Sequence, residues 1–169
     1  MQRLSGIAVK IQWASPKKTP PDWNDIRHTT AIHSLYWVRS GTGKFVSDQG
    51  SYTAESSSLF YLKPGLNMTM AARGGRGLDM FMILFDAAHL SGSDGRWPDP
   101  SPVATLELPH RSAFSGETAV EIDALFSRIA ALWSNGVPTG ELEASGVLLS
   151  LIARLHADLA PEKEKARSL

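Results

Sequence analysis

The sequence contains no cysteine and no excess of charge of either sign. With zero cysteines among 169 residues, a disulfide framework and a thiolate metal site are both excluded. Lysine and arginine together number 17, as do aspartate and glutamate, so the formal net charge is zero. A neutral chain has no electrostatic field that would attract a polyanion. We therefore expect that this segment does not itself contact DNA.

The sequence also lacks a targeting leader and any long apolar run. No charged-then-apolar segment begins the chain, and no run of about 18 apolar residues, the length that spans a bilayer, occurs in it. These absences predict a soluble, cytoplasmic protein with no membrane partner. The content of 43% hydrophobic and 20% charged residues is typical of globular proteins, and the length suits one domain.

Up to about residue 80 the chain has the pattern of short strands joined by tight turns. The turns include residues 40–43 and 64–67, where glycine supplies the positive φ that such turns need. The predicted strands cover residues 7–13, 34–39, 44–47, 51–54, 58–62, 68–72 and 78–85, with a further edge strand at 103–108. Regularly spaced short strands indicate an antiparallel sandwich or barrel.

After Ser115 the apolar residues recur with a helical period. The first helix is capped by Ser115 and stops at Asn135 and Gly136. A second helix, capped by Thr139, is predicted to end before Pro161. A short connection favours an antiparallel pair. The apolar stripe of the second helix, which we assign to dimerisation, consists of Leu148, Leu151, Ile152, Leu155 and Leu159.

The helix pair does not have the pattern of a DNA reader. A helix-turn-helix has a turn of three or four residues and a recognition helix with basic side chains. Here the connection is longer, and Arg154 and His156 are the only basic side chains between residues 139 and 160. The apolar stripe is therefore for packing.

Two segments carry a family resemblance. Residues 33–45, HSLYWVRSGTGKF, run from an apolar strand into a G-x-G turn, and residues 52–65, YTAESSSLFYLKPG, give two strands and a Pro-Gly turn. Residues 80–85 then form an apolar strand that ends in phenylalanine. In this order, and with the helices that follow, the chain resembles the sensor domain of AraC-family transcription regulators over about residues 27–159.

The resemblance implies a mainly β fold, a cupin-like antiparallel β-barrel (jelly roll) followed by an antiparallel pair of α-helices. It also implies an effector pocket in the barrel, an N-terminal arm that closes over the pocket, and a homodimer through the C-terminal helices. The chain would divide into a sensor with its arm (1–114), a dimerisation subdomain (115–160) and a linker (161–169) toward a DNA-binding domain that this chain lacks. We thus predict a ligand-sensing and dimerisation domain of a bacterial regulator, with no enzymatic activity and no cofactor.

A cupin enzyme is the first alternative, and it would need a metal held by histidines and a carboxylate. The histidines are His28, His33, His89, His110 and His156, with no H-x-H pair among them. Met68 stands where a metal cupin would often have histidine. We therefore predict no metal site and no catalytic residue, and expect the histidines at the surface or at caps. The second alternative is an interaction module with a filled barrel.

Strand alternation selects the predicted pocket residues, because every second side chain lies on the same face of a strand. By resemblance, the face of Tyr36, Val38 and Ser40 points into the barrel. Trp13 on the N-terminal strand is expected as a lid. The predicted ligand-binding residues are Trp13, Tyr36, Val38, Ser40, Met68, Met70, Met80 and Met82.

The four methionines suit a small, largely apolar or aromatic effector rather than a sugar, because the thioether side chain adapts its shape easily. The same side chains also suit a filled core, since a small barrel can fill itself. Trp13 needs no ligand if it is a core or interface anchor. The glycine-rich segment 73–77 lacks the following helix that would bind phosphate, and we expect a mobile hairpin tip there.

Overall fold

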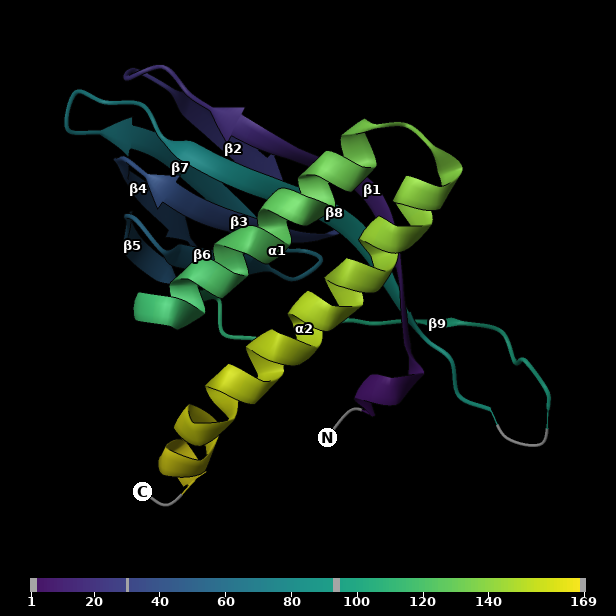
Figure 1. Cartoon of the computed structure of the whole chain (residues 1–169). Coiled ribbons are helices and arrows are strands. Elements are labelled where there is room, and N and C mark those ends of the chain that lie inside the picture. The colour runs from purple at the N-terminus through teal and green to yellow at the C-terminus, as the bar shows by residue number, and fades with distance from the viewer. Residues whose placement is uncertain (1–2, 30, 93–94, 168–169) are drawn as a thin grey trace.

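The computed structural model describes residues 3–29, 31–92 and 95–167, with side chains up to residue 159. Two antiparallel sheets face each other, and two helices cover the outer face of the larger sheet (Figure 1). The larger sheet, sheet A, has the strand order β1-β8-β3-β6-β10, with β9 paired to β8. The smaller sheet, sheet B, has the order β2-β7-β4-β5.

A short 3-10 turn at Leu4–Gly6 precedes the strands. The strands are β1 (Ile7–Lys18), β2 (Asn24–His28), β3 (His33–Ser40), β4 (Thr42–Ser47), β5 (Gly50–Ala54), β6 (Ser58–Leu62), β7 (Asn67–Arg73), β8 (Asp79–His89), β9 (Ser101–Pro102) and β10 (Arg111–Ala113). The helices are α1 (Gly116–Ser134) and α2 (Pro138–Arg167). They run in opposite directions, and the last turns of α2 project beyond the sheets (Figure 1).

The chain crosses repeatedly between the sheets. β3, β6 and β8 belong to sheet A, whereas β4, β5 and β7 belong to sheet B. This alternation confirms the predicted mainly β jelly-roll fold with a helix pair after it. The described strands form two separate sheets rather than a closed barrel, and the sandwich is open between its edge strands β1 and β2.

Several predicted element bounds are wrong. β1 continues through Pro16 to Lys18, which an edge strand allows because proline's missing N–H need not pair. β2 was not predicted, since four of its five residues are polar and the strand alternates between exposed and half-buried positions. Residues 103–108 form no strand, and the short strands β9 and β10 lie on either side of them.

The predicted end of the second helix before Pro161 is also wrong. α2 continues to Arg167, so most of the segment assigned to a linker is helical. Proline removes one backbone hydrogen bond and disfavours a straight helix, but the glutamate, lysine and alanine residues around it favour helix. The side chains of this segment lie outside the described residues, and its role as a linker remains a prediction.

The central strands of sheet A are buried on both faces, and two apolar cores lie on the two sides of the sheet. Every residue of β6 and residues 33–38 of β3 are buried, as expected of a strand covered on both sides. Leu35 and Trp37 face the helices and belong to one core. Tyr36 and Val38 face sheet B and belong to the other core. The predicted alternation of β3 therefore sorts its side chains between the two cores.

Candidate functional site

Six of the eight predicted pocket residues meet between the sheets. Tyr36, Val38, Met68, Met70 and Met80 are at most 1% exposed and belong to one apolar core, and the half-buried Met82 packs against it. Cross-strand pairing brings them together, because Tyr36 lies opposite Met82 and Val38 lies opposite Met80. We call these six residues the methionine cluster.

The other two predicted residues lie outside the methionine cluster. Ser40 is exposed at the end of β3, after a register shift between Val38 and Ser40. Trp13 is 53% exposed on β1, where it follows a register irregularity and lies opposite Leu84. Its Nε1 donates to Ser15 Oγ at 2.9 Å. Trp13 therefore lies largely exposed on an edge strand of the sandwich, and its role as a lid stays a prediction.

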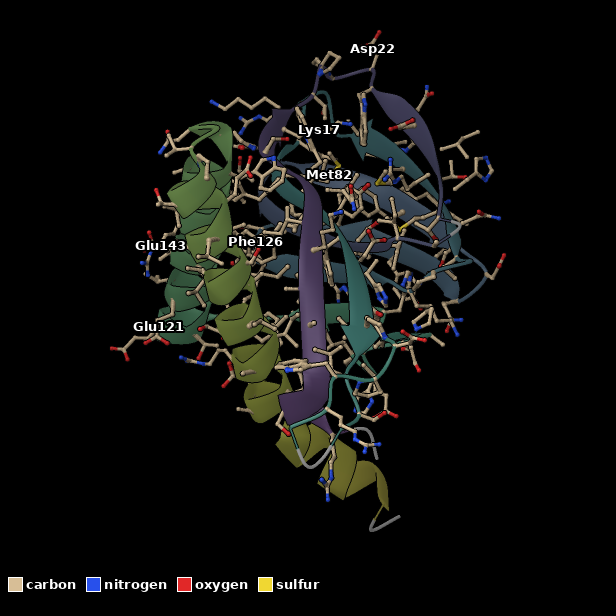
Figure 2. The ribbon with its side chains drawn as sticks, turned by 90° about the vertical axis from the view of Figure 1, so that its right-hand side faces the viewer. Lys17, Asp22, Met82, Glu121, Phe126 and Glu143 are labelled. Carbon is tan, nitrogen blue, oxygen red and sulfur yellow. The ribbon has the colours of Figure 1, made fainter. Side chains whose placement is uncertain are left out.

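Side chains fill the methionine cluster in this conformation. Phe45 and Phe60 complete it with ring centroids 4.7 Å apart. A ligand would enter by displacing side chains, and Met82 is the member of the cluster nearest to solvent. Figure 2 shows Met82 beside β1, on the side away from the helices.

A groove of about 670 Å³ lies at one end of the sandwich. Its floor is formed by two cross-strand pairs of β1 and β8, Ala8 with Ala88 and Lys10 with Asp86. Alternation along β8 places Ala88, Asp86, Leu84 and Met82 on one face, so this end groove and the methionine cluster share a strand floor. The groove was not predicted, because its walls come from separate loops, among them Ala31, Pro64 and residues 102–104.

Two polar side chains between the sheets have atoms without a hydrogen-bond partner. Ser34 is fully buried, and its Oγ has no partner within the described part of the chain. The Nε of the half-buried Arg27 is likewise buried and unpaired. Ser34 lies opposite Leu84, and Arg27 lies opposite Met68. Arg27 could not be assigned to a face from the sequence, because β2 was not predicted.

The Tyr36 hydroxyl is a buried hydrogen-bond donor near these groups. Burial raises the pKa of Tyr36 to about 12, and the Arg27 guanidinium and the Asp25 carboxylate shift this pKa in opposite directions. Tyr36 is therefore protonated at neutral pH. The charge of Arg27 is close enough to act on the phenol.

A cation and a carboxylate connect the two edge strands at the open side. Lys17 Nζ on β1 lies 3.8 Å from Asp25 Oδ2 on β2. The same ammonium lies 5.1 Å from the centroid of the Trp23 ring. Figure 2 shows Lys17 near the end of β1 that leads to the β1–β2 connection. These contacts connect the edges by side chains where no backbone ladder joins them.

The chain matches the family model described as the AraC-like ligand binding domain over residues 17–165. The chain belongs to this family. The match confirms the resemblance predicted from the strand and turn sequences. A search of curated proteins gives no match.

Solved structures with similarity to this AraC-like domain include several cupin proteins. A predicted oxalate decarboxylase from Thermotoga maritima is 14% identical, with a TM-score of 0.42 over 44% of this chain and 66% of its own. A Cupin 2 conserved barrel protein from Salinispora arenicola is 15% identical, with a TM-score of 0.40 over 48% and 78%. ToxT from Vibrio cholerae, bound to (E)-4-(8-methylnaphthalen-1-yl)but-3-enoic acid, is 17% identical, with a TM-score of 0.38 over 45% and 30%. The chain therefore matches just under two thirds of the first structure and less than a third of ToxT.

His33 of the AraC-like domain is a buried structural residue, so the prediction of a surface or capping role is wrong for it. Its side chain is on the helix side of sheet A and the residue is 1% exposed. Nδ1 lies 2.7 Å from Tyr61 Oη, and Nε2 lies 3.0 Å from the Val103 carbonyl oxygen. The ring also stacks on Phe85, with centroids 5.4 Å apart. Because both nitrogens are occupied, His33 holds the segment after β9 against the sheet.

No group of three metal-ligating side chains occurs within the residues that the structure describes. In the same part of the chain, none of the helices has the length and apolar character needed to cross a membrane.

The five residues assigned to dimerisation pack within the chain. Leu148, Leu151, Ile152, Leu155 and Leu159 are 0–5% exposed and belong to the core between the helices and sheet A. In this conformation they present no surface to a partner. Other apolar side chains of the helices are exposed, at 70% for Val120, 76% for Leu142 and 40% for Leu149. Figure 2 shows Glu121 and Glu143 on the outer side of the helix pair.

Proposed function

We propose that this AraC-like domain senses a small, largely apolar or aromatic effector that binds between its two sheets. The observation that carries the proposal is the combination of a methionine-rich interior with the unpaired polar atoms of Ser34 and Arg27. A buried polar group without a partner costs about 1–3 kcal/mol, which a ligand that pairs with it would recover. Methionine changes rotamer readily, so the interior can adapt to a guest.

The effector signal would pass from β3 to α1. The inner face of β3 carries Tyr36, whereas Trp37 and Arg39 bind Asp123 of α1. Trp37 Nε1 donates to Asp123 Oδ1 at 2.9 Å, and Arg39 Nε donates to the same oxygen at 3.0 Å. A ligand that displaces Tyr36 therefore acts on a strand whose other face holds a helix. An effector shifts such an equilibrium when it binds one arrangement better than the other.

The helices would transmit this signal in a homodimer of a transcription regulator, through a DNA-binding domain outside these 169 residues. We propose that the dimer forms through the exposed face of α2, since the predicted stripe is buried. Leu142 and Leu149 lie two turns apart on this face. Gly146 lies between them, and nothing lies within 4 Å of the position of a Cβ there. A partner helix could approach closely at this glycine.

A panel of small apolar and aromatic molecules, screened by thermal shift, tests the effector site. Met82→Trp would fill the inner end of the site, and Ala88→Trp would fill the end groove. Ile26→Trp is the matched control, because Ile26 is 61% exposed on β2. We expect a hit to stabilise the wild type and I26W but not M82W. A hit that only A88W abolishes would exclude the methionine cluster as its site, and the absence of any saturable hit would favour a filled interaction module.

The dimer proposal is tested by sedimentation of the wild type and of a Leu142→Lys, Leu149→Glu double variant. The wild type should sediment as a dimer and the double variant as a folded monomer. Val120→Lys, at the exposed apolar residue on α1, is the control and should remain a dimer. A double variant that stays dimeric would place the interface elsewhere.

A further inference from the structure

We propose that the effector is an apolar carboxylic acid whose carboxylate is bound by Arg27, with the hydroxyl groups of Ser34 and Tyr36 as further donors. This inference rests on the proposed function, because it names the chemical class of the effector at the same site. It follows from where the polar atoms lie and from which of them are already occupied.

Ser34 and Arg27 belong to different sheets but lie at the same end of the sandwich. Ser34 pairs with Leu62, the last residue of β6, and Arg27 pairs with Met68, near the start of β7. A turn of four residues, 63–66, joins these two strands. The partners of Ser34 and Arg27 are therefore held together by one tight connection. Pro64 of this turn also lines the end groove.

The polar groups at this end offer donors and a positive charge. The guanidinium of Arg27 has no ion-pair partner among the described carboxylates, and its Nε has no hydrogen-bond acceptor. Ser34 contributes an unpaired hydroxyl. Tyr36 lies two residues further along the same face of β3, and its hydroxyl is the third donor of the set. A site with these groups lacks an acceptor with negative charge, which an incoming anion would supply.

The nearby acid is already engaged. Asp25 shares its face of β2 with Arg27, because Asp25 pairs with Met70 and Arg27 pairs with Met68. However, Asp25 Oδ1 accepts from the Ile26 N–H at 2.8 Å, and Oδ2 lies 3.8 Å from Lys17 Nζ. Asp25 therefore neutralises Lys17 at the open edge. The charge of Arg27 remains available to a ligand.

The remainder of the ligand must be apolar, because the part of the inner face that holds the methionine cluster is apolar, whereas Lys10 and Asp86 lie toward the end groove. Beyond Arg27 and Ser34 the inner face presents Met82, Met70 and Met80. Methionine packs against aliphatic and aromatic groups alike. A guanidinium binds carboxylate through parallel hydrogen bonds. The combination selects a monocarboxylate with an apolar body over a sugar, an amine or a neutral hydrocarbon.

The test compares three matched probes, 4-phenylbutyrate, 4-phenylbutanol and 4-phenylbutylamine, by isothermal titration of the whole chain. We expect 4-phenylbutyrate to bind about tenfold more tightly than the alcohol, since a charge-assisted hydrogen bond separates them. The amine should bind most weakly of the three. Arg27→Gln should remove the preference for the acid and leave the affinity for the alcohol within about twofold of wild type.

Arg76→Gln is the matched control, because Arg76 is exposed in the turn between β7 and β8. The R76Q variant should keep the preference for the acid over the alcohol. Ser34→Ala should weaken binding of the acid more than binding of the alcohol. Equal affinity of acid and alcohol, or an unchanged preference in R27Q, would overturn the carboxylate inference and leave the effector site intact. If neither acid nor alcohol binds, both the inference and the proposed sensing site fail.

Discussion

The hydroxyl of Tyr61 donates to Nδ1 of His33 across 2.7 Å. The direction follows from the other bonds, because Tyr61 Oη accepts from the Leu106 N–H at 2.9 Å and His33 Nε2 faces the Val103 carbonyl at 3.0 Å. Nε2 therefore carries the proton and Nδ1 accepts. This network requires a neutral imidazole. Burial lowers the pKa of His33, which is the largest effect on that group.

The stability of the domain should fall as the pH drops below 6.5. The folded-state pKa of His33 lies below its ordinary value of 6.5, so the unfolded chain takes up the proton first and is favoured. The loss begins near pH 6.5 and continues until the folded-state pKa is reached, at about 1.4 kcal/mol for each pKa unit of lowering. Urea denaturation at pH values between 8 and 5, about one unit apart, measures the slope of the free energy of unfolding against pH.

His33→Gln should have a shallower slope than the wild type over the same pH range. Part of the slope should remain, because burial also lowers the pKa of His110. His28→Gln, at an exposed histidine on β2, is the control and should keep the slope of the wild type. Equal slopes in H33Q and the wild type would show that His33 does not couple protonation to folding.

Leu151 should behave as a core residue rather than as an interface residue. It is 0% exposed between the helices and sheet A. Leu151→Ala should therefore lower the free energy of unfolding by about 2–5 kcal/mol through the cavity it leaves, and Leu151→Asp should not fold. Val120→Lys, at a residue 70% exposed, should melt within a few degrees of the wild type. A folded, monomeric L151D variant would restore the original assignment of this stripe to dimerisation.

Asp123 should stabilise the contact between α1 and the sheet. Trp37 is 1% exposed, and its indole N–H donates to Asp123. Asp123→Ala should cost about 1–3 kcal/mol, because that N–H loses its acceptor. Glu121→Ala is the control on the same helix. Its partner Arg154 lies in an exposed pair, so the loss of this pair should cost much less stability than the loss of Asp123, and equal losses in the two variants would refute the role of Asp123.

Gly77 should tolerate no side chain. A Cβ built at this position would lie 1.7 Å from the Thr19 carbonyl oxygen, so the β1–β2 connection would have to move. Gly77→Ala should cost at least about 1–3 kcal/mol, as expected for overpacking. Gly146→Ala is the control, since nothing within the chain lies near its Cβ position and alanine favours helix by about 1 kcal/mol. Both substitutions are made in the Leu142→Lys, Leu149→Glu background, so that a dimer contact at Gly146 does not affect the result. A higher melting temperature for G77A than for G146A would contradict this packing.

Gly77 also shows what turn composition could not predict for the glycine-rich segment. Turn composition predicts a hairpin tip, and β7 and β8 do flank one at this place. Gly74 and Gly75 have positive φ and open surroundings, as a tip requires. Gly77, in contrast, is needed for a close backbone approach by a segment nearly sixty residues earlier in the chain. No local sequence pattern predicts a contact between segments so far apart in the chain.

The sequence by itself determined the order of the two helices and of the strands β1 and β3 to β8, the family and the residues that share a face of each of these strands. Period-two alternation groups Tyr36 with Val38 and Met80 with Met82, because it is a property of the local backbone. Only the tertiary structure decided what covers each face. It placed the stripe of α2 against its own sheet, buried His33 and brought Arg27 to the end of the sandwich where Ser34 lies. Periodicity fixes the side on which a residue lies, whereas its partner depends on the packing of segments distant in sequence.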